Sequence, residues 1–93
     1  MMMKTVNLRI TGRVQGVWYR AWTRDTATEL GLNGWVRNRM DGSVEAVVQG
    51  DDAAINQLIE KCWDGSPASK VHDIKVTSSD ETVDAGFKQE RTV

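Results

Sequence analysis

The sequence predicts an α+β fold in which an antiparallel sheet carries two helices on one face. Three observations lead to it: residues 5–11 alternate between polar and apolar, residues 19–30 and 55–62 repeat apolar side chains at helical spacing, and an Asp-Gly pair separates two β-rich runs. With 93 residues, of which 40% are hydrophobic and 27% charged, the chain is expected to form a single domain over residues 1–93.

The first strand is expected over residues 5–11, whose apolar side chains fall on one face. A helix is expected to begin near Trp18 and to end before Gly31, because glycine commonly follows the last turn of a helix. Its apolar stripe is predicted at Tyr19, Trp22, Thr23, Thr26, Ala27 and Leu30. Residues 34–40 and 43–48 are expected to pair around a two-residue type I′ turn at Asp41-Gly42.

A second helix is expected with Asp51 as its cap and an end near residues 64–65. A fourth strand is expected over residues 71–77, with Val71 out of phase at a bulge, and a short last strand over residues 87–91. The order β-α-β-β-α-β predicts a ferredoxin-like α/β sandwich, a scaffold that does not fix a function. The stripe of the second helix is predicted at Ile55, Leu58, Ile59 and Cys62.

The segment of residues 12–20 lies between the first strand and the first helix and contains two glycines and two arginines. A glycine-containing loop that leads into a helix N-terminus can bind an anion through free backbone N–H groups and the helix dipole. The alternative is a tight turn in which glycine only permits a positive φ. Residues 1–40 carry a net charge of +5 and residues 41–93 carry −6, which favours a small anionic ligand near this loop.

Several other kinds of site are disfavoured by the residues present. The two glycines of the loop do not match the spacing of dinucleotide or Walker motifs, and a single Cys and a single His do not suggest a metal site. Cys62 lies on an apolar helix stripe and His72 in a strand, so both are interpreted as structural. Without a long apolar run and with one cysteine, the chain is expected to be cytoplasmic and not membrane-bound.

Three tryptophans bear on the fold and the site. Trp22 and Trp35 are interpreted as core or near-core residues. Trp18 lies beside the loop, where it could line a site or cover the start of the helix, and we favour the second interpretation. Because the outer sheet face is expected to lack aromatic residues on which bases could stack, RNA binding is disfavoured.

Two polar residues are candidates for a functional site. Arg20 is expected in the first helical turn, where its guanidinium could fork onto an anion that the loop holds, although a solvated surface arginine is the common alternative. Asn38 lies in a strand, where asparagine is disfavoured, and could hold a water through its donor and acceptor or be a tolerated edge residue.

Residues 12–20 read G-R-V-Q-G-V-W-Y-R and resemble the first signature of acylphosphatases, G-[KR]-V-Q-G-V-x-[FY]-R. Residues 34–45 read G-W-V-R-N-R-M-D-G-S-V-E and resemble the second signature, G-[FYW]-V-x-N-x-x-D-G-[ST]-V-E. The resemblance covers essentially the whole chain. Its weakest part is the polar C-terminal segment from Phe87, where the family commonly has a more apolar ending.

The resemblance implies hydrolysis of a small-molecule acyl phosphate to a carboxylate and inorganic phosphate. It implies that Arg20 binds phosphoryl oxygens, that Asn38 orients the attacking water, and that no metal or organic cofactor is used. We expect a monomer with no nucleic-acid or membrane partner. The backbone cradle for the phosphate is implied at Arg13, Val14, Gln15, Gly16 and Val17.

The residues suit this chemistry, because an acyl phosphate expels a carboxylate and needs no strong general acid. One arginine, several N–H donors and one amide would serve it, whereas a phosphate monoester would require protonation or a metal at its leaving oxygen. The alternatives are a non-catalytic phosphate-binding module of the same fold and, less favoured, an RNA-binding sheet module.

Overall fold

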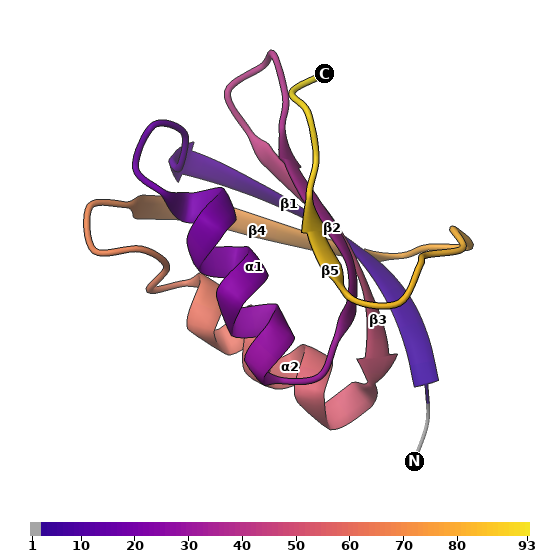
Figure 1. Ribbon diagram of the computed structural model, residues 1–93. Coiled ribbons are helices and arrows are strands. Elements are labelled where there is room, and N and C mark those ends of the chain that lie inside the picture. Colours follow the sequence, from indigo (N-terminus) through magenta and orange to yellow (C-terminus); the bar gives the residue numbers. More distant parts are fainter. Residues whose placement is uncertain (1–2) are drawn as a thin grey trace.

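The computed structural model describes residues 3–93, so the first two residues of the expected domain lie outside the described part. The sheet has the strand order β4-β1-β3-β2-β5, and both helices lie on the same face of it (Figure 1). This confirms the expected α+β class. The elements are β1 (Met3–Arg13), α1 (Tyr19–Glu29), β2 (Asn33–Asn38), β3 (Val44–Asp51), α2 (Asp52–Cys62), β4 (Lys70–Ser78) and β5 (Phe87–Gln89).

The strand pairs β1–β3, β1–β4 and β2–β3 are antiparallel, whereas β5 pairs with β2 in parallel. The sheet is therefore mostly and not wholly antiparallel. The reason is the connection after β4: it passes from one edge of the sheet to the other, so that β5 enters beside β2 in the same direction (Figure 1). Asn33 fixes this entry, since its Oδ1 accepts a hydrogen bond from the Gly86 N–H at 2.9 Å.

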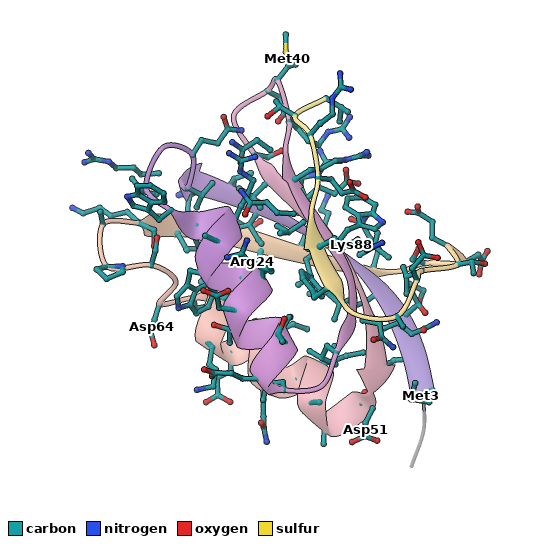
Figure 2. The ribbon with its side chains drawn as sticks, in the orientation of Figure 1. Met3, Arg24, Met40, Asp51, Asp64 and Lys88 are labelled. Atoms are coloured by element: carbon teal, nitrogen blue, oxygen red, sulfur yellow. The ribbon has the colours of Figure 1, made fainter. Side chains whose placement is uncertain are left out.

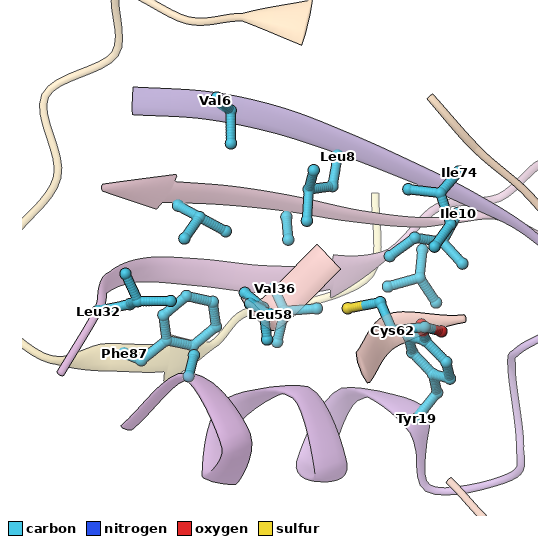
Figure 3. Packing of buried hydrophobic residues seen from close by; sticks show 14 of the residues in the cluster. Val6, Leu8, Ile10, Tyr19, Leu32, Val36, Leu58, Cys62, Ile74 and Phe87 are labelled. Carbon is cyan, nitrogen blue, oxygen red and sulfur yellow. The ribbon is translucent and has the colours of Figure 1, made fainter. Parts of the chain in front are cut away.

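The core lies between the sheet and the helices and is formed by apolar residues from every element (Figure 3). Both helix stripes contribute, with Ala27 and Leu58 completely buried. Tyr19 and Cys62 lie beside each other at one end of this layer (Figure 3), and the Tyr19 hydroxyl donates a 2.6 Å hydrogen bond to the Cys62 carbonyl oxygen. The two helices are thereby joined next to the start of α1.

The β1–β4 pair extends beyond the expected strands. β1 continues to Arg13, so Gly12 and Arg13 belong to the strand and only residues 14–18 form the loop. The pairing skips His72 between Asp73 and Val71, which confirms the expected bulge. At the bulge a Cβ at position 12 would collide with the Lys70 carbonyl oxygen, so this close approach requires glycine.

The turn between β2 and β3 is not the expected two-residue type I′ turn. That turn needs a positive φ at both central residues, but only Gly42 has one (φ 93°), and Asp41 does not. Instead, Gly42 N–H bonds to the Arg39 oxygen at 3.1 Å and Arg39 N–H to the Ser43 oxygen at 2.9 Å. The result is a three-residue hairpin loop in which Gly42 supplies the left-handed residue.

Trp22 packs against the core as expected, but Trp35, interpreted as a core or near-core residue, does not. In β2, Val36 and Asn38 face the helices, so Trp35 faces the other side of the sheet. There it is half-buried, and the Arg37 guanidinium lies 4.5 Å from the centre of its ring. The expectation that the outer sheet face lacks aromatic residues is therefore wrong at this position.

Candidate functional site

A cleft of about 460 Å³ opens between the loop of residues 14–18, the first turns of α1, the end of β2 and β5. The loop, the β2–β3 turn and the C-terminal segment lie at the same end of the molecule (Figure 1). Three segments that are far apart in the sequence therefore supply one site. The cleft is lined by Val14, Gly16, Trp18, Tyr19, Arg20, Ala21, Arg24, Asn38 and Gln89.

The structure brings together Arg20, Asn38, Val14 and Gly16 from the predicted site. The other three residues of the predicted cradle do not line the cleft. Their positions are set by other contacts: Arg13 is an exposed strand residue, Val17 is part of the core, and the Gln15 side chain binds the β2–β3 turn.

The loop presents backbone donors that have no acceptor among residues 3–93. In the described chain, the N–H groups of residues 14–18 form no hydrogen bond with a backbone acceptor, and the backbone N–H groups that bond to side chains are those of Ser43, Glu81 and Gly86. The carbonyl oxygen of Trp18 accepts the first bond of α1, from Trp22 N–H at 3.0 Å. The loop donors therefore lie at the N-terminus of a helix, whose dipole favours an anion.

Asn38 is 9% exposed, and its side-chain oxygen Oδ1 is fully buried without a hydrogen-bond partner in the described residues. Its backbone is held on both sides, since its carbonyl oxygen accepts a 3.1 Å bond from Val93 N–H and it pairs with Val44 in β3. A buried acceptor without a partner is costly to a protein, because its desolvation is not offset. Asn38 also lines the cleft, so its side-chain amide is the polar group that the end of β2 presents there.

Side-chain hydrogen bonds fix the loop to its neighbours. Gln15 Nε2 donates to the carbonyl oxygens of Arg39 at 2.7 Å and Ser43 at 2.8 Å, which ties the loop to the β2–β3 turn. The hydroxyl of Ser66, a buried residue after α2, donates to the Val17 oxygen at 2.7 Å. These bonds fix the loop relative to the β2–β3 hairpin and to the segment after α2 before any ligand enters.

The charges at the cleft favour an anion. Both charged side chains that line it, Arg20 and Arg24, are arginines.

The remaining titratable groups near the cleft are neutral or lie outside it. Burial raises the pKa of Tyr19, so its hydroxyl stays protonated, and burial raises the pKa of the Cys62 thiol to about 12. Cys62 is completely buried, which confirms its structural interpretation, and His72 lies exposed on β4 outside the cleft lining. Among residues 3–93, no three His, Cys, Asp or Glu side chains are grouped so that they could hold a metal ion.

The opposite face of the sheet holds a closed network around Glu45. The side chain of this residue is 9% exposed, and its carboxylate accepts hydrogen bonds from Asn7 at 2.9 Å, Arg37 at 3.0 Å and Arg39 at 2.9 Å. Burial by itself would raise the pKa of Glu45, but these hydrogen bonds outweigh it and lower the pKa to about 2. Glu45 therefore remains charged and holds the β2–β3 hairpin against β1.

Among the cleft residues that the sequence did not assign to the site, Arg24 and Gln89 carry long polar side chains. Arg24 had a usable signal, because it lies four residues after Arg20 and hence on the same helix face. It is labelled on α1 in Figure 2, and its Nη1 lies 3.4 Å from Gln89 Oε1. Gln89 had no local signal, since its place depends on the parallel pairing of β5 with β2.

Comparison with known proteins identifies relatives of the chain. Residues 6–89 match the family model Acylphosphatase. An acylphosphatase of Rhodospirillum rubrum is 51% identical over 87 residues, which cover 94% of this chain and 96% of the relative. Among solved structures, an acylphosphatase from Bacillus subtilis matches with a TM-score of 0.88 at 38% identity, covering 96% of this chain and 99% of that one. An acylphosphatase from Coxiella burnetii matches with a TM-score of 0.90 at 32% identity over 95% and 93% of the two chains.

Proposed function

Because the chain belongs to the acylphosphatase family and has acylphosphatase activity, we propose that the cleft between the loop and β2 is the active site, with Arg20 and Asn38 as its catalytic residues. The observation that carries this proposal is that Asn38, a strand residue whose Oδ1 has no partner in the described residues, lines the same cleft as Arg20 and Gly16. The cleft thus combines an amide that can hold a water with donors that can bind a phosphoryl group.

Arg20 and the loop together bind the phosphoryl group in this proposal. The N–H groups of residues 14–18, which have no backbone acceptor in the described chain, cradle its oxygens, and the Arg20 guanidinium forks onto them from the first turn of α1. In a loose phosphoryl-transfer transition state, charge spreads over these oxygens. Donors fixed in advance stabilise that charge without reorganising. The resemblance implies this cradle at residues 13–17, of which Val14 and Gly16 line the cleft.

Asn38 orients the attacking water. Its side-chain amide forms a hydrogen bond with the water, so the water oxygen turns a lone pair toward phosphorus, in line with the bond to the acyl oxygen. That bond breaks, the carboxylate leaves with the electron pair, and the water oxygen becomes part of inorganic phosphate. We propose that a substrate oxygen accepts the proton of the water, since the described side chains lining the cleft include neither a carboxylate nor a histidine. A carboxylate leaves readily, so no protein acid or metal is required at the leaving oxygen.

The domain organisation, the size of the substrate, the location and the oligomeric state are also proposals. A single domain over residues 1–93 is supported by one core that draws on every element, and a small-molecule substrate by the size of the cleft. A cytoplasmic location is supported by a single buried cysteine. No helix formed by residues 3–93 is long and apolar enough to cross a membrane. We further propose a monomer that acts without nucleic acid.

Hydrolysis of acetyl phosphate in the presence of EDTA tests the proposed site. We expect full activity with the chelator in the wild type, and a loss of about 10²- to 10³-fold in kcat/KM in Arg20→Ala, because a central charge stabiliser is removed. The matched control is Arg91→Ala, which removes an exposed arginine outside the cleft lining and should leave kcat/KM unchanged. Unchanged turnover in Arg20→Ala would remove Arg20 from the mechanism, and inhibition by EDTA would overturn its independence of metal.

The main alternative for the cleft is a site that binds phosphate without turning over acyl phosphates. Calorimetric titration with inorganic phosphate separates the two. Saturable binding that Arg20→Ala abolishes, together with no hydrolysis by the wild type, would favour the binding module. Binding together with turnover is the result that the proposed mechanism predicts.

A further inference from the structure

Trp18 lies at the rim of the cleft with its side chain in solvent. The residue is 82% exposed, although it lines the same cleft as Arg20 and Asn38. The interpretation of Trp18 as a cover for the start of α1 is therefore wrong, because a ring that covered the helix would be largely buried. Its place two residues before Arg20 puts a large flat apolar surface next to the proposed phosphate site.

The backbone of Trp18 has a φ of 67°, and it is the one residue other than glycine with a positive φ in the described part of the chain. A bulky side chain is rarely found in this left-handed region, which glycine or asparagine occupies more readily. The conformation has a cost, and burial of the indole does not offset it, since the ring is exposed. Within residues 3–93 the aromatic pair is formed by Tyr19 and Trp22, so no aromatic partner holds the Trp18 ring either. An unusual backbone conformation of this kind at the edge of a site points to a role in that site.

The acyl part of the substrate needs a place in the same cleft. Once the phosphoryl group is held by the loop and Arg20, the acyl group extends from one bridging oxygen along the remaining wall. At the α1–β5 end of this wall the side chains bind one another, with Arg24 contacting Gln89 at 3.4 Å and Asp25 at 3.1 Å. The indole of Trp18 offers the open apolar surface.

We propose that Trp18 is the platform on which the acyl group of the substrate stacks, so that the enzyme favours flat, apolar acyl groups, such as an aromatic carboxylate, over short ones. This inference rests on the proposed active site and adds a determinant of substrate choice to it. A planar acyl group contacts the face of the ring, and aromatic pairs contribute beyond the area that they bury. Stacking takes place away from the phosphorus, where charge changes little during the reaction. It therefore stabilises the bound substrate and the transition state alike and acts on KM more than on kcat.

The test compares benzoyl phosphate with acetyl phosphate in Trp18→Gly and Trp18→Phe. Glycine accepts the positive φ, so the loop keeps its shape while the ring is lost. We expect Trp18→Gly to lower kcat/KM for benzoyl phosphate by about 3- to 10-fold through KM, as loss of one aromatic contact predicts, with less than about a twofold change for acetyl phosphate. Trp18→Phe keeps an aromatic face and should retain most of the preference. Trp63→Ala is the matched control, because Trp63 is half-exposed at the end of α2 and does not line the cleft.

Equal losses for both substrates, or no loss for either, would overturn the role of Trp18 in selecting the acyl group. If Trp18→Gly does not fold in a urea titration, Trp18→Asn is read in the same way, since asparagine also tolerates a positive φ and carries no ring. Failure of the active site itself has a different signature, because Arg20→Ala would then leave the hydrolysis of both substrates unchanged.

Discussion

The loop of residues 14–18 and the hairpin turn of residues 39–43 are both short glycine-containing segments beside the cleft, but they differ in how they use their polar groups. In the turn, Arg39 and Gly42 donate backbone bonds within the segment, and the Asp41 carboxylate accepts from both the N–H and the hydroxyl of Ser43. In the loop, the backbone N–H groups donate to no backbone acceptor of the described chain. The turn stabilises itself, whereas the loop keeps its donors available for a ligand.

The two segments also differ in strain. Each places a glycine at a positive φ, 73° for Gly16 and 93° for Gly42, where glycine is well accommodated. The loop also contains Trp18 with a φ of 67°, and the turn contains no residue other than glycine with a positive φ. The segment that is proposed to bind substrate thus combines a run of open donors with this strained residue, whereas in the described turn only the Asp41 N–H forms no hydrogen bond.

The largest effect on activity that tests the comparison of loop and turn is expected for Asn38→Ala, at the end of β2 just before the turn. Loss of the side-chain amide should lower kcat by about 10²- to 10³-fold, in the range measured for removal of one preorganised polar group, while the affinity for inorganic phosphate changes little. Stability should hold, because an acceptor without a partner is removed. Steady-state kinetics and phosphate titration measure the two effects.

Asn33→Ala is the matched control, the same residue type at the other end of β2. Its Oδ1 binds the Gly86 N–H, so its removal should lower the free energy of unfolding by about 1 kcal/mol and leave kcat nearly unchanged. A large fall in phosphate affinity with an intact kcat in Asn38→Ala would show that the residue binds substrate and does not orient water.

The next effect concerns the hairpin network and its response to acid. The pKa of Glu45 is lowered to about 2 in the folded protein, against an ordinary value near 4.3 for an unfolded glutamate. Its stabilisation is therefore complete above about pH 4.3 and is lost as the pH falls toward 2. The size of the shift corresponds to at most about 3 kcal/mol in the free energy of unfolding. Hydrogen bonds from Ser43 also lower the pKa of Asp41, in the same direction.

Urea unfolding at pH 7, 4 and 2.5 tests this prediction with Glu45→Gln. The variant should be less stable than the wild type at pH 7 and lose less stability on acidification. Activity at pH 7 should remain close to the wild type under native conditions, because Glu45 lies on the sheet face opposite the helices. Glu60→Gln, at an exposed position on α2, serves as the control. A parallel decline of the wild type and Glu45→Gln between pH 4 and 2.5 would contradict the role of Glu45.

The smallest effect on stability and activity is expected for Gly16→Ala and Gly42→Ala. A Cβ at position 16 or 42 would meet no atom within 4 Å, so strain at the positive φ is the shared cost, about 1 kcal/mol in each variant. Only Gly16→Ala should also lower kcat/KM, by about tenfold or more, since it disturbs the proposed phosphate cradle. Equal kinetic losses in Gly42→Ala would break the distinction between a binding loop and a supporting turn.

Local patterns predicted most of the secondary structure. Apolar periodicity and the positions of glycine and proline predicted the strand of residues 5–11, both helices and the bulge near Val71. The structure confirms these elements, with bounds that differ by a few residues. The same patterns placed Arg20 in the first turn of a helix, where it lies. They failed at Trp35, because alternation divides a strand into two faces without saying which one meets the helices.

The sequence by itself determined the chemical groups of the candidate site: a loop with donors at a helix N-terminus, one arginine beside it and one asparagine in a strand. Only the tertiary structure decided which of these groups share a cleft, that Trp18 is exposed at its rim, and that Arg24 and Gln89 complete its wall. The physical reason is the range of the interactions. Helix and strand periodicity act over a few residues, whereas the cleft depends on the pairing of β2 with β5 and on the contact of α1 with both, which join residues distant in the chain.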